Sequence, residues 1–207
     1  MFDTREKKER SVGTRLFLKP FRSQSPKAAM VRRPQRPGMH GKAHRRAPSE
    51  FSQQLSEKQK IKYTYGLREA QLRNTFKKAM KSPATTGPLF MSLLERRLDS
   101  ALFRLGFAPS RSVARQLIGH GHIQVNGKRV KAPSFQVRPK DVISIRPASK
   151  AHPLFKDLSE RLEKAETPTW LQLDAPKTEG KVIALPRDFE MPFDIGLVVD
   201  YYSKIVK

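Results

Sequence analysis

Cysteine is absent from this chain of 207 residues. Its absence excludes disulfide bonds, thiol nucleophiles and zinc sites that are built on thiolate ligands. No stretch of the chain approaches the roughly 18 to 20 continuous apolar residues that a membrane-spanning helix needs. The first ten residues are largely charged and hold no apolar run, so they do not predict a secretory signal. We therefore expect a cytoplasmic protein that does not span a membrane.

Acidic residues are scarce, because 19 Asp and Glu stand against 42 Lys and Arg and leave a formal net charge of +23. Few folded proteins carry this much self-repulsion unless a polyanion neutralises it. Nucleic acid is the expected polyanion, and an anionic membrane surface is the competing one.

The positive charge is unevenly distributed along the chain. Residues 1–50 carry a net charge of +10, residues 51–90 carry +6 and residues 91–150 carry +9, whereas residues 151–207 carry −2. This asymmetry predicts a polyanion-binding body and a C-terminal part with another task. A general surplus of solubilising charge is the alternative, but such a surplus would not need to stop near residue 150.

Residues 20–48 are rich in proline, glycine and basic side chains, as in Arg32-Arg33-Pro34-Gln35-Arg36-Pro37-Gly38. Proline fixes the backbone and interrupts helices, so this segment is predicted to be extended chain with little core of its own. Residues 1–48 are therefore predicted to form a basic extended RNA-binding arm that becomes ordered along phosphates. An idle flexible tail is the alternative.

Helical patterning begins at Ser49-Glu50-Phe51-Ser52, which offers helix-start chemistry. Gly66 interrupts the pattern, and a second helical stretch then runs to Ala79 with basic residues on its solvated sides. The run Ser82-Pro83-Ala84-Thr85-Thr86-Gly87-Pro88 breaks the pattern again, which predicts a domain boundary there.

The clearest helical period covers residues 91–105, which are predicted to form one helix that ends at Gly106. Ser110 then caps a shorter predicted helix through Ile118. The apolar stripe of the longer helix consists of Met91, Leu94, Leu98, Ala101, Leu102 and Leu105. The residues predicted to face away from that stripe are Glu95, Arg96, Asp99 and Arg104.

Strand patterns follow the two helices. Asn126-Gly127 between alternating apolar residues predicts a hairpin turn, because both turn residues must accept a positive φ. Alternation continues over 135–137 and 143–145, and further strands are predicted at 170–173 and 181–185. Two helices, a hairpin and short strands make a compact α+β unit.

Two more helices are predicted beyond residue 150. Leu154, Leu158 and Leu162 recur at helical spacing within a charged stretch. The segment 194–204 is ambiguous between strand and helix, and Pro192 with Asp194 at its start favours a short helix.

Basic side chains gather around the second of the two central helices and the hairpin. Arg111 and Arg115 are four residues apart, so they project from neighbouring turns of one helix. His120, His122, Lys128 and Arg129 continue this surface past the helix end and onto the hairpin turn. Such a surface suits the wide, shallow minor groove of RNA and its phosphates. Two ordinary solvated helix faces are the alternative.

Motifs over this region carry a family resemblance. They are Arg97-Leu98-Asp99, Arg104-Leu105-Gly106-Phe107, Ser110-Arg111, Ala114-Arg115-Gln116-Leu117-Ile118, His120-Gly121-His122-Ile123 and Val125-Asn126-Gly127. They resemble the RNA-binding domain of the ribosomal protein S-four family, a domain that several RNA-modifying enzymes also carry as an appendage. The flanks resemble the same ribosomal family in order along nearly the whole chain. The flanking motifs are Gly13-Thr14-Arg15-Leu16-Phe17-Leu18-Lys19, Pro37-Gly38-Met39-His40-Gly41, Glu57-Lys58-Gln59-Lys60, Tyr65-Gly66-Leu67-Arg68-Glu69-Ala70-Gln71-Leu72-Arg73-Asn74, Pro168-Thr169-Trp170-Leu171 and Tyr202-Ser203-Lys204.

The resemblance implies an α+β fold class, with a helical N-terminal domain and an inserted S-four-type RNA-binding domain of helices and a small antiparallel sheet. Residues 49–90 would form the helical domain, completed by 187–207. Residues 91–186 would form the RNA-binding domain together with its C-terminal strands. The resemblance also implies a structural constituent of the small ribosomal subunit that binds its ribosomal RNA early in assembly.

The resemblance further implies partners and binding residues. The partners are small-subunit ribosomal RNA, ribosomal protein S-five at an interface that influences decoding accuracy, and messenger RNA where it enters the subunit. The residues expected to bind ribosomal RNA are Arg32, Arg33, His40, Lys58, Lys60, Arg68, Arg73, Arg97, Arg111, Arg115, Gln116, His120 and Lys128. The candidates for the messenger RNA path are Lys42, His44, Arg45 and Arg46.

The chain departs from those family members that hold zinc in this N-terminal region with four cysteines. The matching positions here are Glu6, Glu9, Ser23 and Ala28, and an alanine cannot ligate a metal. The histidine pairs 40 with 44 and 120 with 122 could imitate ligand pairs, but they lack thiolates or a convergent carboxylate. We expect no metal, no cofactor and no small-molecule substrate.

An RNA-modifying enzyme with this domain attached, such as a pseudouridine synthase, is the rival from another class. Arg97-Leu98-Asp99 superficially resembles the surroundings of that family's catalytic aspartate, but here it lies inside an amphipathic helix. Asp99 is instead expected to be a helix-surface partner of Arg96 or of nearby backbone. No phosphate-binding glycine loop or catalytic triad can be assembled, so no enzymatic activity is expected. A small RNA chaperone built on the same module is the other alternative.

Overall fold

The computed structural model describes residues 5–18, 25–43, 47–149, 155, 158, 162, 166–187 and 192–205. The chain forms two compact units, one of residues 1–90 with 190–207 and one of residues 91–189. The boundary between them falls inside a helix and not in the proline-rich run 82–88 that the sequence favoured. None of the described helices has both the length and the apolar character that a bilayer crossing requires.

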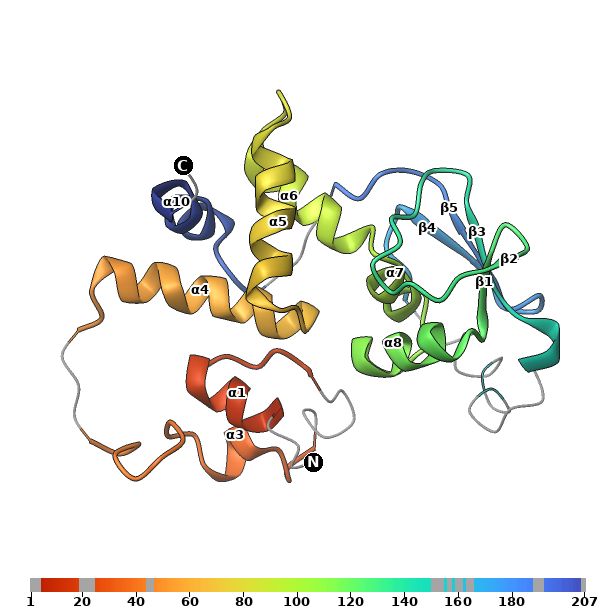
Figure 1. The fold of residues 1–207 in the computed structure, drawn as a ribbon. Coiled ribbons are helices and arrows are strands. Elements are labelled where there is room, and N and C mark those ends of the chain that lie inside the picture. Colours follow the sequence, from red (N-terminus) through yellow and green to blue (C-terminus); the bar gives the residue numbers. More distant parts are fainter. Residues whose placement is uncertain are drawn as a thin grey trace. The chain divides into compact units, whose positions relative to one another are not determined.

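The first unit is helical (Figure 1). Its helices are α1 (Arg5–Val12), α3 (Ala29–Arg32), α4 (Glu50–Tyr65), α5 (Glu69–Met80), the start of α6 (Thr86–Glu95) and α10 (Ile195–Ile205). The predicted start of α4 is confirmed, because the Ser49 side chain accepts a hydrogen bond from the backbone N–H of Ser52 at 3.3 Å. Gly66 ends α4 with φ 58°, a left-handed conformation that glycine adopts without strain.

The N-terminal arm is not extended throughout, so that part of the sequence prediction is wrong. Residues 5–12 contain neither proline nor glycine, and they form α1. Lys8 Nζ lies 5.3 Å from the centre of the Tyr63 ring on α4, and Leu16 and Ala28 are buried. The arm therefore has a small core of its own, built where prolines do not interrupt it.

Aromatic side chains join the C-terminal helix α10 to the rest of this unit. The Phe76 ring on α5 lies 4.8 Å from the Tyr202 ring and 5.4 Å from the Phe90 ring, measured between centroids. The helix predicted over 194–204 is confirmed as α10, and Asp194 Oδ1 accepts the backbone N–H of Gly196 at 2.8 Å. In Figure 1, α10 lies beside α4 although about 130 residues separate them in the chain.

A polar cluster around Glu69 also holds α10 in place. The carboxylate of Glu69 accepts hydrogen bonds from Lys58 Nζ at 3.0 Å, Lys62 Nζ at 2.9 Å and Tyr202 Oη at 3.0 Å. Burial raises the pKa of Tyr202 well above its usual value, so the hydroxyl keeps the proton that it donates. Burial alone would raise the pKa of Glu69, but the hydrogen bonds from Lys62, Lys58 and Tyr202 outweigh burial and lower it.

The cluster predicts an acid-sensitive helical unit. A carboxyl whose pKa is lowered by folding contributes stability above its unfolded pKa, and this stability is lost as the pH falls through the lowered value. In Glu69→Gln, the decrease in the free energy of unfolding that protonation of this carboxyl causes at acidic pH should disappear. Urea unfolding followed by far-ultraviolet circular dichroism at a series of acidic pH values measures it. Glu166→Gln, at an exposed position of the second unit, is the control and should keep the wild-type pH dependence.

The second unit packs two helices with an antiparallel sheet. The helices are α7 (Leu98–Arg104) and α8 (Arg111–His120), followed later by the short 3-10 helix η1 (Pro147–Ser149). The sheet order is β2-β1-β3-β5-β4, in which the strands are β1 (Ile123–Val125), β2 (Lys128–Arg129), β3 (Val142–Ile145), β4 (Leu171–Asp174) and β5 (Glu179–Val182). Both helices and four of the strands, all but β2, contribute side chains to one apolar core.

The predicted hairpin is confirmed. Asn126 and Gly127 have φ values of 52° and 74° between β1 and β2. The predicted cap of α8 is also confirmed, since Ser110 Oγ accepts the N–H of Val113 at 3.3 Å. The helix continues to His120, past the predicted end, and Gly121 stops it with φ 76°.

The single helix predicted over 91–105 is wrong. α6 ends at Glu95 and α7 begins at Leu98, with Arg97 in extended conformation at ψ 138°. Backbone groups that have no helical partner at this break form hydrogen bonds with the segment 133–137. The N–H of Leu98 donates to the Phe135 carbonyl at 2.8 Å, and the N–H of Val137 donates to the Arg96 carbonyl at 2.9 Å. The apolar stripe remains buried across the break, so the period was right and the continuity was not.

The C-terminal strands and helix differ in detail from expectation. β4 lies close to the predicted 170–173, whereas β5 starts and ends earlier than the predicted 181–185 and leaves Ile183 exposed. Residues 135–137 make one bridge, between Gln136 and Arg97, and no regular strand. Most of the helix predicted around residues 154–162 lies outside the described residues, although Leu158 and Leu162 are buried in the core.

A glycine in β5 tests how tightly the helices pack on the sheet. A Cβ at Gly180 would overlap Leu105 Cδ1, so Gly180→Ala should lower the free energy of unfolding by about 1 to 3 kcal/mol through overpacking. Urea unfolding followed by the fluorescence of Trp170, which is buried in the same unit, measures the change.

Gly119→Ala on α8 is the matched control for that substitution. Beyond its chain neighbours and the backbone of its own helix, no atom lies within 4 Å of a Cβ at Gly119, so this variant should be unchanged or more stable by up to about 1 kcal/mol. Equal effects of the two substitutions would contradict the packing described here.

Candidate RNA-binding surfaces

Two buried carboxylates organise the arginines of the second unit. Glu95 at the end of α6 accepts hydrogen bonds from Arg104 Nε and Nη2, each at 3.1 Å, and from Arg111 Nη2 at 3.3 Å. Asp99 in the first turn of α7 accepts Arg97 at 2.9 and 3.0 Å and Arg115 Nε at 2.7 Å. Both acids are almost completely buried. Four guanidinium groups thus converge on two anions at the break between α6 and α7.

This arrangement corrects one expectation and decides between two alternatives in another. Glu95 and Asp99 were expected on a solvated helix face, whereas both are buried because the break turns them toward α8. Asp99 was expected to partner Arg96 or nearby backbone, and the second alternative holds, because the backbone N–H of Ser100 donates to Asp99 Oδ1 at 3.0 Å whereas Arg96 Nε donates to the Val137 carbonyl at 3.0 Å.

The network holds the two arginines of α8 that the sequence singled out. The Arg111 guanidinium lies 4.6 Å from the Phe103 ring centre, and its Nε donates to Ser100 Oγ at 3.3 Å. Arg111 and Arg115 remain partly exposed, with 12% and 29% of their side-chain surface accessible. Their orientation is therefore fixed before RNA binds, and part of their charge is already compensated by Glu95 and Asp99.

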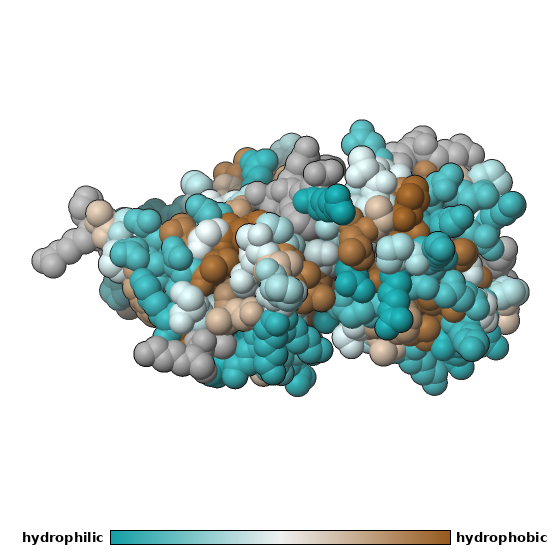
Figure 2. Space-filling model, turned by 90° about the horizontal axis from the view of Figure 1, so that it is seen from above, coloured by the Kyte–Doolittle hydropathy of each residue, from teal (hydrophilic) through white to brown (hydrophobic). Residues whose placement is uncertain are grey.

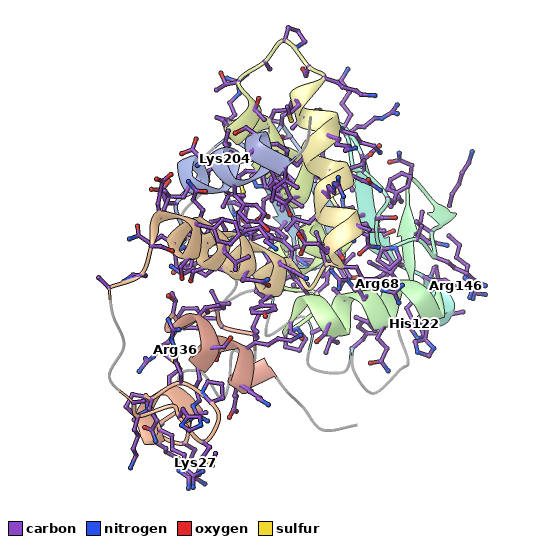
Figure 3. All side chains as sticks on the ribbon, turned by 60° about the vertical axis from the view of Figure 1, so that its left-hand side comes forward. Lys27, Arg36, Arg68, His122, Arg146 and Lys204 are labelled. Atoms are coloured by element: carbon purple, nitrogen blue, oxygen red, sulfur yellow. The ribbon has the colours of Figure 1, made fainter. Side chains whose placement is uncertain are left out.

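The end of α8 and the β1–β2 hairpin form a second group of basic and polar side chains, which we call the hairpin edge. It consists of Gln116, His120, His122, Lys128, Arg129 and Arg146. Arg129 ties the hairpin to the helix end, because it donates to the carbonyls of Gly121 at 3.2 Å and His120 at 3.0 Å. The rings of His120 and His122 stack at 6.0 Å, and Figure 3 shows His122 and Arg146 together beyond the end of α8.

The helical unit presents basic side chains along α5. Arg68, Arg73, Lys77 and Lys78 are exposed, and none of them has an ion-pair partner among the described residues. Lys60 on α4 is partly exposed and pairs with Glu57. Lys58, in contrast, is 4% exposed and pairs with Glu69, which also accepts a hydrogen bond from Tyr202 of α10.

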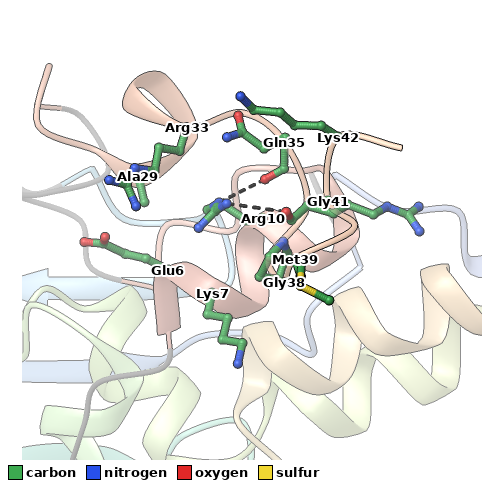
Figure 4. Close-up of a pocket in the computed structure, with 12 residues that line it drawn as sticks. Glu6, Lys7, Arg10, Ala29, Arg33, Gln35, Gly38, Met39, Gly41 and Lys42 are labelled. Carbon is green, nitrogen blue, oxygen red and sulfur yellow. Dashed lines mark hydrogen bonds between the residues drawn. The ribbon is translucent and has the colours of Figure 1, made fainter. Parts of the chain in front are cut away.

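The folded N-terminal arm encloses a basic pocket of about 740 Å³ (Figure 4). Lys7 and Arg10 of α1 line it together with Arg33, Arg36 and Lys42 of the following loop. Arg10 Nε donates to the Gln35 carbonyl at 3.0 Å and so fixes this loop. The close turn requires glycine at position 41, because a Cβ there would overlap the Arg36 carbonyl oxygen.

Part of this pocket was not predicted from the sequence. Lys7, Arg10 and Arg36 were not singled out, because only the folding of the arm brings α1 beside the loop. The arm also projects basic side chains outward, as Lys27 and Arg36 show in Figure 3.

The predicted site residues fall into four groups. Those exposed to solvent are Arg32, Arg33, His40, Lys42, Arg68, Arg73, Gln116, His120 and Lys128. Those partly exposed and ion-paired are Lys60, Arg111 and Arg115. Those buried are Lys58 and Arg97. His44, Arg45 and Arg46 lie outside the described residues.

Hydrophilic side chains cover most of the face shown in Figure 2, with separate apolar patches among them. Within the described part of the chain, no group of three or more His, Asp or Glu residues is arranged to hold a metal ion. The exposed chemistry is thus dominated by cations that attract phosphate.

Comparison with known protein families defines the class first. Residues 2–95 match the family described as "Ribosomal protein S4/S9 N-terminal domain", and residues 96–143 match the "S4 domain". The chain is therefore a ribosomal protein with a helical N-terminal domain and an S4 domain.

Relatives over nearly the full length identify the particular family. The chain is 45% identical to the small ribosomal subunit protein uS4 of Thermus thermophilus, 46% identical to that of Caldicellulosiruptor saccharolyticus and 44% identical to that of Gloeobacter violaceus, each over 197 residues that cover 94% of both chains. The chain belongs to the small ribosomal subunit protein uS4 family. This membership confirms the predicted family, the fold class and a structural rather than enzymatic role.

The carboxylate network generates a stability prediction. Asp99→Asn removes the anion that Arg97 and Arg115 share, and breaking a buried ion pair on one side typically costs about 3 to 5 kcal/mol. The free energy of unfolding, from urea titration followed by Trp170 fluorescence, should fall by an amount of that order.

Asp174→Asn is the control for this substitution. Asp174 forms an exposed pair with Lys177 in the same unit, and exposed pairs contribute only about 0 to 1 kcal/mol. A loss in Asp99→Asn as small as that in the control would show that the buried network does not hold this unit together.

Proposed function

We propose that this protein is a structural component of the small ribosomal subunit in the cytoplasm, where it binds the ribosomal RNA early in assembly. One observation carries the proposal: both units carry exposed cations with no carboxylate partner among the described residues, namely Arg68, Arg73, Lys77 and Lys78 along α5 and Lys128 and Arg129 on the hairpin edge. A folded RNA supplies the phosphates that neutralise such surfaces. Membership of the uS4 family agrees with this role.

The rRNA-binding residues follow from exposure. We assign direct contacts to Arg32, Arg33, His40, Lys60, Arg68, Arg73, Arg111, Arg115, Gln116, His120 and Lys128. The buried Lys58 and Arg97 support these contacts indirectly, through Glu69 and Asp99. The domains carry separate surfaces: residues 1–48 as the arm, 49–90 with 187–207 as the helical domain, and 91–186 as the RNA-binding domain.

The near-neutral C-terminal segment serves contacts between proteins. Lys204 of α10 pairs with Glu50 of α4 at 3.1 Å, and Phe51 and Ile205 leave apolar surface exposed near this pair. Such a face suits a protein neighbour better than a phosphate backbone, and we assign it to ribosomal protein S-five. A change in decoding accuracy on substitution of these residues would support the assignment.

Messenger RNA entering the subunit would pass the arm. Lys42 is exposed and lines the basic pocket, and His44, Arg45 and Arg46 follow after Ala43 in the chain. Crosslinking from position 42 to messenger RNA in translating ribosomes tests this path, and crosslinks to ribosomal RNA alone would argue against it.

The RNA-binding proposal predicts a change in both affinity and salt dependence. In Arg68→Gln with Arg73→Gln, two exposed charges are lost, and each charged hydrogen bond contributes about 1.5 to 3 kcal/mol. Binding of a small-subunit ribosomal RNA fragment, measured by filter retention across a range of potassium chloride, should weaken. Its logarithmic salt slope should become shallower by about 1 per lost phosphate contact.

Lys177→Gln with Lys204→Gln is the charge-matched control, because both lysines already pair with a carboxylate. If the control loses as much affinity as the α5 variant, net charge and not the position of the cations governs binding. If the wild-type protein does not bind this RNA in low salt, the proposed function is wrong.

A further inference from the structure

Phe17 combines exposure with a backbone conformation that aromatic residues rarely adopt. Nearly half of its surface is exposed, and its φ is 51°, in the left-handed region. For a bulky residue this conformation is an outlier that persists only where the surrounding structure holds it. Single exposed apolar residues are common and need no explanation, but an exposed residue that is also held in a strained backbone does.

The side chain of Glu9 holds this conformation. Glu9 lies on α1 and is 4% exposed, and its Oε1 accepts the backbone N–H of Leu16 at 3.3 Å and of Leu18 at 3.0 Å. The two amides on either side of Phe17 therefore converge on one anionic oxygen, as in the concave backbone turns that bind anions. Leu16 is buried, which leaves Phe17 as the residue turned outward at the apex.

The exposed ring and its left-handed backbone are not explained by the stability of the fold. An exposed ring buries little apolar surface, and a left-handed aromatic residue opposes folding relative to glycine at the same place. A buried carboxylate is also costly unless its hydrogen bonds compensate for the lost water. The ring is therefore held exposed in a conformation that is unfavourable for folding, and such residues are typical of binding sites.

The charge around the ring identifies the chemistry of its ligand. Residues 1–50 carry a net charge of +10, and Arg15 next to the turn is exposed. Unpaired bases of RNA stack on exposed aromatic side chains, while neighbouring cations bind the flanking phosphates. An apolar pocket of a protein partner would accept the same ring but would not require this positive field.

We propose that Phe17 is a stacking platform for an unpaired nucleobase of the bound RNA, and that Glu9 is the positioning residue that holds the ring outward. The proposal rests on the proposed function, because it needs the RNA to lie along the arm. It adds a base contact to an interface whose other assigned contacts are mostly cations.

Binding of the full-length protein to a small-subunit ribosomal RNA fragment tests the platform. Phe17→Ala should weaken binding by about 5- to 100-fold, the range for loss of one stacked base. Phe17→Leu should weaken it nearly as much, because it keeps apolar bulk without a π face, whereas Phe17→Tyr should bind like the wild type. The salt slope should stay unchanged in all three variants, since no phosphate contact is lost.

Phe135→Ala is the matched control, because Phe135 is also an exposed aromatic residue but lies in the second unit, outside every contact assigned to RNA or to a protein neighbour. It should leave RNA affinity unchanged. In Phe17→Trp the new indole should lose fluorescence on RNA binding through base stacking, while the buried Trp170 supplies the unchanged background seen in the wild type.

The positioning role of Glu9 is tested by a double-mutant cycle. Glu9→Ala should weaken RNA binding, and Glu9→Ala with Phe17→Ala should weaken it little more than either substitution alone, because both remove one stacking contact. Additive losses would show that Glu9 acts only through the stability of the arm, and the positioning role would be overturned.

Three outcomes overturn the platform itself. Wild-type affinity in Phe17→Ala, or unquenched fluorescence of Phe17→Trp in saturating RNA, excludes stacking. Normal RNA affinity of Phe17→Ala combined with poor incorporation into reconstituted small subunits assigns the ring to a protein neighbour instead. Failure of the wild-type protein to bind RNA would instead remove the proposed function, so the two failures are distinguishable.

Discussion

Two buried carboxylates at one helix break hold the second unit together. Glu95 and Asp99 neutralise four arginines from three parts of the chain, in a protein whose net charge is +23. Without these anions the guanidinium groups would repel one another and could not approach the core between α7 and α8. Through Arg111 and Arg115 the two acids at this break also orient α8, and with it the hairpin edge that we assign to RNA.

A similar arrangement serves the helical unit. Glu69 on α5 accepts hydrogen bonds from two lysines of α4 and from the Tyr202 hydroxyl of α10. These bonds hold the C-terminal helix α10 against α4 and α5. Acidic groups are few in this protein, and several of them are used where positive charge must be brought close together. The cations left without a carboxylate lie on the exposed faces, where RNA phosphates can neutralise them.

In the arm, too, a buried acid positions a group that faces outward, which here is Phe17. There the acid Glu9 accepts backbone amides instead of cations, and what it fixes is the direction of an aromatic ring. Carboxylates position the binding groups in both units, while the groups that face outward are basic or aromatic. Hydrogen bonds to buried carboxylates thus orient the side chains of the binding surfaces. This agrees with an interface that is preorganised before RNA binds.

The sequence alone determined the helix caps, the hairpin turn and the distribution of charge. The cap at Ser49, the stop at Gly66, the Asn126-Gly127 turn and the basic bias of residues 1–150 could each be read directly, since each depends on neighbouring residues or on composition. The tertiary structure decided the break before Leu98 and the burial of Lys58 and Asp99. Those depend on partners far along the chain, because a distant backbone segment or an opposite charge can outweigh helical period and hydrophilicity.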